Sequence, residues 1–142
     1  MIDNNRMMHI MGVSRLMKQK ASLLGLDEKE MFILGFLHDF GYEFQDLNKH
    51  AIFAGEIMEN MGFKHYKEIM FHGDIDAEYK SLALDLLNWC DMHIDGKGNF
   101  VTFEERLNDI KTRHGENSLA YKNCLTMVDR LRNNEKLKVL GD

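Results

Sequence analysis

Proline is absent from this chain of 142 residues, and cysteine occurs only twice, at Cys90 and Cys124. Without proline, glycine has to mark the ends of the secondary-structure elements. The two distant cysteines form no CxxC pair, which argues against a disulfide framework or a thiolate metal site and is typical of a reduced, cytoplasmic protein. No apolar run approaches the roughly 18 residues of a membrane span, and no secretory signal pattern opens the chain. We therefore expect a cytoplasmic protein without a membrane partner.

Positive charge is also scarce, because 18 lysines and arginines stand against 23 acidic residues and leave a formal net charge of −5. A protein that binds the phosphate backbone of a nucleic-acid duplex needs a basic face, so that class of partner is disfavoured. The hydrophobic share of 44% is enough to bury a core without disulfide staples. We expect one domain over residues 1–142, and the oligomeric state is left open.

Helical periodicity is what the sequence does contain, and glycines follow the apolar stripes where helices would end. Asp27 and Thr102, each with a glutamate three residues later, have the spacing of helix N-caps with a capping box. The helices that we expect cover residues 5–24, 28–41, 48–62, 64–72, 77–92, 102–115 and 118–137. Short connections and no linker then predict an all-α, single-domain bundle of six or seven helices.

Histidines and acids gather near the expected helix ends or on apolar faces. His9 lies beside apolar positions of the first helix, His38 and Asp39 lie at the end of the second, and Asp91 ends the fifth. Buried charges need partners, and a divalent cation is one of them. Adjacent side chains point about 100° apart on a helix, so His38 and Asp39 share an ion only if the helix ends there, as Gly41 indicates. The two carboxylate oxygens of Asp39 would also allow it to bridge two ions.

Five motifs occur in order along residues 6–98: RMMHIMGV, FLHDFG, HAIFAGEIM, MFHG and LLNWCDMHIDGKG. Together they give the pattern H…HD…D, and over residues 6–115 the chain resembles the HD-domain superfamily of metal-dependent phosphohydrolases. Within that superfamily it looks most similar to the bacterial hydrolases that split diadenosine tetraphosphate symmetrically and to small uncharacterised HD proteins. The resemblance implies an all-α HD-domain fold.

A divalent metal, one of Mn, Fe, Co, Ni, Zn or Mg, is the cofactor that this resemblance implies. His50 and His72 stand where two-metal members of the superfamily place histidines, so the count of one ion or two is left open. Arg6 stands where such proteins often carry an arginine. The ligands implied for a single ion are His9, His38, Asp39 and Asp91.

The activity that the resemblance implies is hydrolysis of a small phosphorylated substrate, a nucleotide or another phosphate ester, by water activated at the metal. Asp39 would hold the metal, and Arg6 would neutralise charge on the phosphoryl oxygens. Glu43 and Asp74 are the candidates for the general acid. Many relatives carry a lysine soon after the HD pair, where this chain has Tyr42. A catalytically silent HD-fold module that binds or senses a ligand, with a structural metal, is therefore the alternative.

Other polar residues have two interpretations at this stage. Lys97, Arg106 and Arg113 are either phosphate contacts or parts of solvated surface ion pairs. The stretch 93–104 has the length and glycine position of a calcium loop, but histidine and lysine stand where oxygen ligands are required, so we expect a turn before a capped helix. The remaining histidines are expected to be surface or loop residues: His65, His93 and His114.

Overall fold

The computed structural model describes residues 4–39 and 50–141, and the regular elements of this part of the chain are helices. They are α1 (Asn4–Ala21), η1 (Ser22–Leu24), α2 (Glu28–Leu37), α3 (His50–Asn60), α4 (Tyr66–Phe71), α5 (Leu82–Met92), α6 (Phe103–His114), α7 (Leu119–Arg132) and η3 (Glu135–Leu140). The predicted all-α bundle is confirmed. Of the helices in these ranges, none combines the length and the apolar character needed to cross a bilayer.

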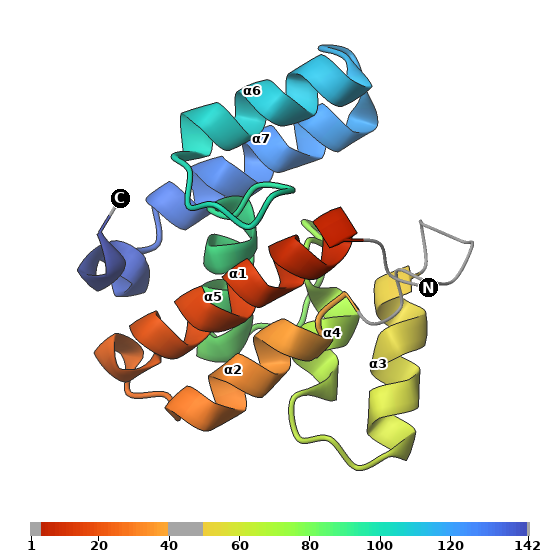
Figure 1. The fold of residues 1–142 in the computed structure, drawn as a ribbon, viewed down its shortest axis with the longest axis vertical. Coiled ribbons are helices and arrows are strands. Elements are labelled where there is room, and N and C mark those ends of the chain that lie inside the picture. The colour runs from red at the N-terminus through yellow and green to blue at the C-terminus, as the bar shows by residue number, and fades with distance from the viewer. Residues whose placement is uncertain (1–3, 40–49, 142) are drawn as a thin grey trace.

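The helices form three packed pairs around α5 (Figure 1). Helices α1 and α2 lie antiparallel, α3 packs on α4 beside them, and α6 and α7 form a hairpin at the other end of the molecule. A close approach seats α2 on α1, because a Cβ atom on Gly35 would lie 2.9 Å from the Cα of Ser14. The turn between α5 and α6 then runs over the N-terminal half of α1, as Figure 1 shows.

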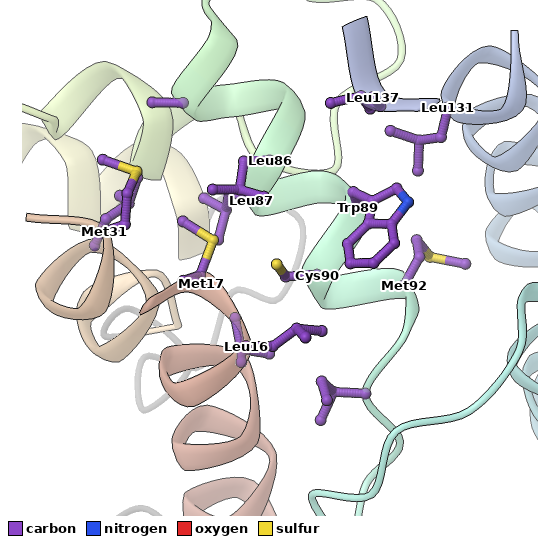
Figure 2. Packing of buried hydrophobic residues seen from close by; sticks show 14 of the residues in the cluster. Leu16, Met17, Met31, Leu86, Leu87, Trp89, Cys90, Met92, Leu131 and Leu137 are labelled. Carbon is purple, nitrogen blue, oxygen red and sulfur yellow. The ribbon is translucent and has the colours of Figure 1, made fainter. Parts of the chain in front are cut away.

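Helix α5 supplies the centre of the hydrophobic core (Figure 2). Its residues Leu86, Leu87 and Trp89 are at most 2% exposed. Side chains of α1 and α2 pack on one side of α5, and side chains of α7 and η3 pack on the other. Because α5 is held from both sides, its last turn, which carries Asp91, is fixed relative to α1 and α2. The flanking side chains that Figure 2 labels are Leu16, Met17, Met31, Leu131 and Leu137.

Local capping fixes most helix ends where the sequence predicts them. Asp27 accepts a hydrogen bond from the backbone N–H of Glu30, and Thr102 forms a complete capping box with Glu105. Four ends differ from the prediction by three residues or more. Helix α1 ends at Ala21 rather than residue 24, and α2 ends at Leu37 rather than residue 41. Helix α5 begins at Leu82 rather than residue 77, because Ser81 caps it, and α7 ends at Arg132 rather than residue 137. The side chain of Asn134 instead caps the separate helix η3.

The turn between α5 and α6 is pressed against α1 through two glycines. A Cβ atom on Gly12 would lie 2.8 Å from the carbonyl oxygen of Gly98, and one on Gly98 would lie 2.5 Å from the carbonyl oxygen of Met8. Gly98 also has a positive φ of 83°, which favours glycine. Inside the turn, Oδ1 of Asp95 accepts from the backbone N–H groups of Lys97 and Asn99. The stretch is therefore a self-closed turn before a capped helix, as predicted.

We expect Gly98→Ala to lower the free energy of unfolding by about 1–3 kcal/mol, because alanine would need a strained backbone and would collide with α1. Gly96→Ala in the same turn is the matched control, since a Cβ atom there meets nothing within 4 Å. Urea denaturation measures both variants. Equal stability of the two would contradict the close contact between the turn and α1.

A buried carboxylate, Glu68, ties α4 to the segment that precedes α5. Glu68 is 2% exposed and accepts hydrogen bonds from the hydroxyls of Tyr79 and Ser81, while Nδ1 of His65 lies 3.0 Å from Oε1. Burial acts to raise the pKa of Glu68, but these hydrogen bonds outweigh it and lower that pKa below its usual value. The same contact with Glu68 is the main cause that raises the pKa of His65.

These two shifts make stability depend on pH. The contribution of Glu68 is present above its unfolded pKa of about 4.3 and is lost as the pH falls through its lower folded pKa. The contribution of His65 is complete below its unfolded pKa of about 6.5 and is lost as the pH rises through its raised folded pKa. We expect Glu68→Gln to cost most stability between about pH 4.5 and 6.5. Urea denaturation across pH tests this, with exposed Glu78→Gln as control; a constant cost across pH would refute it.

Candidate metal centre

Five of the six predicted ligands lie in four helices or directly after them and meet at one place. His9 lies in α1, His38 and Asp39 directly follow α2, His72 directly follows α4, and Asp91 lies in the last turn of α5. Helix α2 does end at Leu37, which meets the condition for His38 and Asp39 to face a common point. The side chains of His9, His38, Asp39 and His72 are all buried.

Three of these side chains have the spacing of ligands around one cation. The ligand atoms of His9, His38 and Asp39 all lie within 4.8 Å of one another. Oδ2 of Asp39 is 3.3 Å from Nε2 of His38 and 3.8 Å from Nε2 of His9. Metal–ligand bonds of about 2.0–2.2 Å place neighbouring ligand atoms roughly 3–4 Å apart. The described residues therefore contain a buried group that fits a divalent metal ion.

Asp91 and His72 adjoin this group from two sides. Oδ1 of Asp91 lies 2.8 Å from Nε2 of His9 and 3.5 Å from Nε2 of His38. Nε2 of His72 lies 3.5 Å from Oδ1 of Asp39, the carboxylate oxygen that does not face the other two histidines. Asp39 thus presents one oxygen to His9 and His38 and the second oxygen to His72, which is the arrangement that a bridging carboxylate needs.

The backbone fixes the protonation of each ring. Nδ1 of His38 lies 2.6 Å from the carbonyl oxygen of Gly35, and Nδ1 of His72 lies 2.6 Å from that of Ile69. A carbonyl oxygen only accepts, so Nδ1 is assigned as the donor in both rings. Nε2 of a neutral ring then presents a lone pair, and metal-binding histidines commonly donate their other N–H in this way.

Nδ1 of His9 likewise lies 3.1 Å from the carbonyl oxygen of Asp95, and its Nε2 is within hydrogen-bond distance of Oδ1 of Asp91, at 2.8 Å. Nε2 of His38 is buried and forms no hydrogen bond within the described part of the chain. Lone pairs that face carboxylate oxygens repel them unless a ring is protonated or a cation lies between. The donor set of imidazole nitrogen and carboxylate oxygen suits a transition metal or Zn²⁺.

The electrostatics of the cluster show how it balances its charge. Burial acts to lower the pKa of His38, but the charges of Asp39 and Asp91 outweigh burial and raise that pKa to about 9. Burial acts to raise the pKa of both carboxyl groups, yet the neighbouring histidines hold the pKa of Asp39 and of Asp91 well below the usual range. Near neutral pH a proton on His38 therefore supplies the positive charge that a metal ion would replace.

Arg6 brings a second positive charge to the cluster. Its Nη1 donates a hydrogen bond to Oδ2 of Asp39 at 2.8 Å, and its side chain is 25% exposed. Arg6 and His9 also line a cavity of about 590 Å³ that reaches from α1 to α6. The cluster thus adjoins this cavity through Arg6 and His9, which line it.

Three predicted residues are not part of the described cluster: Asp74, Glu43 and His50. Asp74 is on an exposed turn, where its Oδ1 accepts from the backbone N–H of Asp76, and its role as a general acid stays a prediction. Glu43 lies outside the described residues, and so does the side chain of His50, the first residue of α3.

The bland interpretation of the other histidines is only partly right. His114 is exposed, as expected. His65 and His93 lie in turns, as expected, but neither is a surface residue. His65 is a half-buried partner of Glu68, and His93 is 0% exposed and stacks on Phe103 at a ring distance of 4.0 Å. A long-range aromatic contact of this kind leaves no local mark in the sequence.

Sequence reasoning also missed the atoms that support the ligands. The carbonyl groups of Gly35 and Ile69 are each three residues before a histidine that directly follows a helix. That spacing is visible in FLHDFG and MFHG once the helix ends are known. No spacing in the sequence indicates the contact between His9 and the carbonyl of Asp95, because the two residues are 86 positions apart along the chain.

Comparison with family models, with curated proteins and with solved structures finds no match for this chain. The resemblance of the motifs to HD phosphohydrolases stays an expectation, and the function has to be inferred from the geometry of the site.

We expect the affinity for Mn²⁺ to rise about tenfold from pH 7 to pH 8, because His38 must lose its proton to bind the ion. Asp39 and Asp91, with lowered pKa values, are ionised at both pH values. Calorimetric titration in two buffers of different ionisation enthalpy measures both the affinity and the proton released. His114→Gln should behave like the wild type. An affinity that does not change with pH would contradict this exchange of a proton for a metal ion.

Proposed function

We propose that this chain is a metal-dependent phosphohydrolase of HD type that acts on a nucleotide or another small phosphate ester. The observation that supports it most is the fixed orientation of three buried histidines, His9, His38 and His72, whose Nδ1 atoms face backbone carbonyls. Their Nε2 atoms face Asp39 or Asp91. A structural cluster has no need for a set of donors aimed at one point, whereas a metal centre does.

Metal binding gives this arrangement its chemistry. A divalent cation held by His9, His38, Asp39 and Asp91 would act as a Lewis acid on water and on a phosphoryl oxygen. The protein itself supplies a positive charge for the phosphoryl group. Oδ2 of Asp39 accepts a hydrogen bond from the guanidinium of Arg6 at 2.8 Å and holds it beside the cavity. From that position Arg6 can bind phosphoryl oxygens and stabilise the negative charge that develops on them.

His72 supports a second ligand position. It is buried, its ring is fixed by the carbonyl of Ile69, and it faces the second oxygen of Asp39. In the HD resemblance, His50 completes such a second set. We therefore propose that Asp39 is the shared ligand if two ions bind, and that the metal content per chain decides between one ion and two.

We expect protein purified without chelator to contain a transition metal and to release phosphate from p-nitrophenyl phosphate or from a panel of nucleotides when Mn²⁺ is added. His38→Gln and Asp39→Asn should each lower metal content and reduce turnover by about 100-fold or more, because each removes a ligand. Elemental analysis and a phosphate-release assay measure the two properties on the same samples. His114→Gln is the matched control and should retain both.

Two results would count against the proposal. Bound metal that depends on His38 and Asp39, with no turnover of any substrate, would favour the binding or sensing module instead. If metal-free protein gains no thermal stability from Mn²⁺, Fe²⁺ or Zn²⁺, the proposal that the cluster binds a metal ion is contradicted.

A further inference from the structure

The cavity beside the cluster has the size of a ligand site and a wall rich in cations. Its volume of about 590 Å³ falls within the roughly 300–1,000 Å³ of small-molecule pockets. The wall includes Arg6 from α1, Lys97 from the turn, and Arg106 and Arg113 from α6. Arg6 and His9 belong to both the cavity and the metal cluster, so a ligand in the cavity lies next to the cluster.

The acidic residues of the same wall are engaged in local structure. Oδ1 of Asp95 accepts from two backbone N–H groups of its own turn. Oε1 of Glu105 accepts from the backbone N–H of Thr102 and closes the capping box of α6. Asp109 lies 2.9 Å from the exposed guanidinium of Arg113. These carboxylates therefore have partners without a ligand.

Within residues 4–39 and 50–141, two cations of the wall, Arg106 and Lys97, do not have partners of the kind that these carboxylates have. The side chain of Arg106 is only 13% exposed, and its Nε atom is buried with no hydrogen-bond partner among the described residues. Its nearest carboxylate contact is Oδ2 of Asp109, at 3.7 Å from Nη1, beyond hydrogen-bond distance. The ammonium of Lys97 forms no hydrogen bond or ion pair with the described part of the chain. Among the described residues, no carboxylate lies within hydrogen-bond distance of the Arg106 guanidinium or the Lys97 ammonium, so both charges of this wall can pair with an anion.

We infer that this cavity is an anion subsite in which Arg106 and Lys97 bind a second phosphoryl group, so that the substrate class is a diphosphate or longer phosphate chain rather than a monophosphate. The inference rests on the proposed function, which places the reacting phosphoryl group at the metal cluster beside Arg6. The planar guanidinium of Arg106 can donate to two oxygens of one phosphoryl group. Lys97 is an exposed residue of the cavity wall and adds a second cation to it.

Binding of AMP and ADP by calorimetry, with the protein as purified, tests this inference. We expect the wild type to bind ADP about tenfold more tightly than AMP, and Arg106→Met to lose that preference. Lys97→Met, in an exposed turn, should reduce it and serves as a second variant if Arg106→Met folds poorly. Lys111→Met on α6 is the matched control, because Lys111 is exposed and outside the cavity wall. Inorganic pyrophosphate and phosphate repeat the comparison without a nucleoside.

Equal affinity of the wild type for ADP and AMP, and for pyrophosphate and phosphate, would overturn the inference. So would a preference that survives in both Arg106→Met and Lys97→Met. Preference for pyrophosphate over phosphate without any for ADP over AMP would support the subsite and assign it to inorganic phosphate chains. Metal content of the same samples separates this inference from the proposed function: a metal-loaded enzyme without a diphosphate preference refutes the subsite alone.

Discussion

Hydrogen bonds between imidazole Nδ1 atoms and backbone carbonyls fix the orientation of the buried histidines in this helix bundle. They fix the rings of His9, His38 and His72, and each ring then turns its Nε2 atom to a carboxylate. The orientation depends on the backbone, so it persists for as long as the helices keep their places. A cation-binding geometry thus follows from where α2 and α4 end and from how the turn after α5 lies on α1. The fold and the site cannot be changed independently.

The described residues include two clusters built around a buried carboxylate, Glu68 in one and Asp39 in the other, and the two clusters differ in their partners. Glu68 is surrounded by groups that can donate, the hydroxyls of Tyr79 and Ser81 and the ring of His65, so its charge is satisfied by the protein. Asp39 and Asp91 face imidazole nitrogens whose other ring atom already serves as the donor to a carbonyl. The first cluster needs nothing further and joins α4 to the chain before α5. The second cluster receives a hydrogen bond from Arg6 to Asp39 and also needs a proton or a metal ion between its imidazole nitrogens and its carboxylates.

Local chemistry explains which parts of this structure the sequence could predict. The caps at Asp27 and Thr102 depend on residues three positions apart, and both were found from the sequence. The start of α5 was misplaced because Ser81 is held by Glu68, a contact that spans 13 residues and that no helical period reveals. The buried group of His9, His38 and Asp39 was predicted from the order and types of these residues. The carbonyl of Asp95 depends on the close fit of Gly98 against Met8, which only the folded chain displays.

Helix α1 connects the two halves of the site. Arg6 and His9 are three residues apart and lie on one face of α1, so the groups that contact Asp39 and the groups that line the cavity move together. Oδ2 of Asp39 accepts from Arg6 and also lies nearest to His38, which means that any cation bound at that oxygen shares it with Arg6. Positive charge at the cluster and the guanidinium that faces the cavity are therefore coupled through a single carboxylate oxygen. In the proposed function, the oxygen that would bind the metal also positions the arginine that would lie nearest to the phosphoryl group.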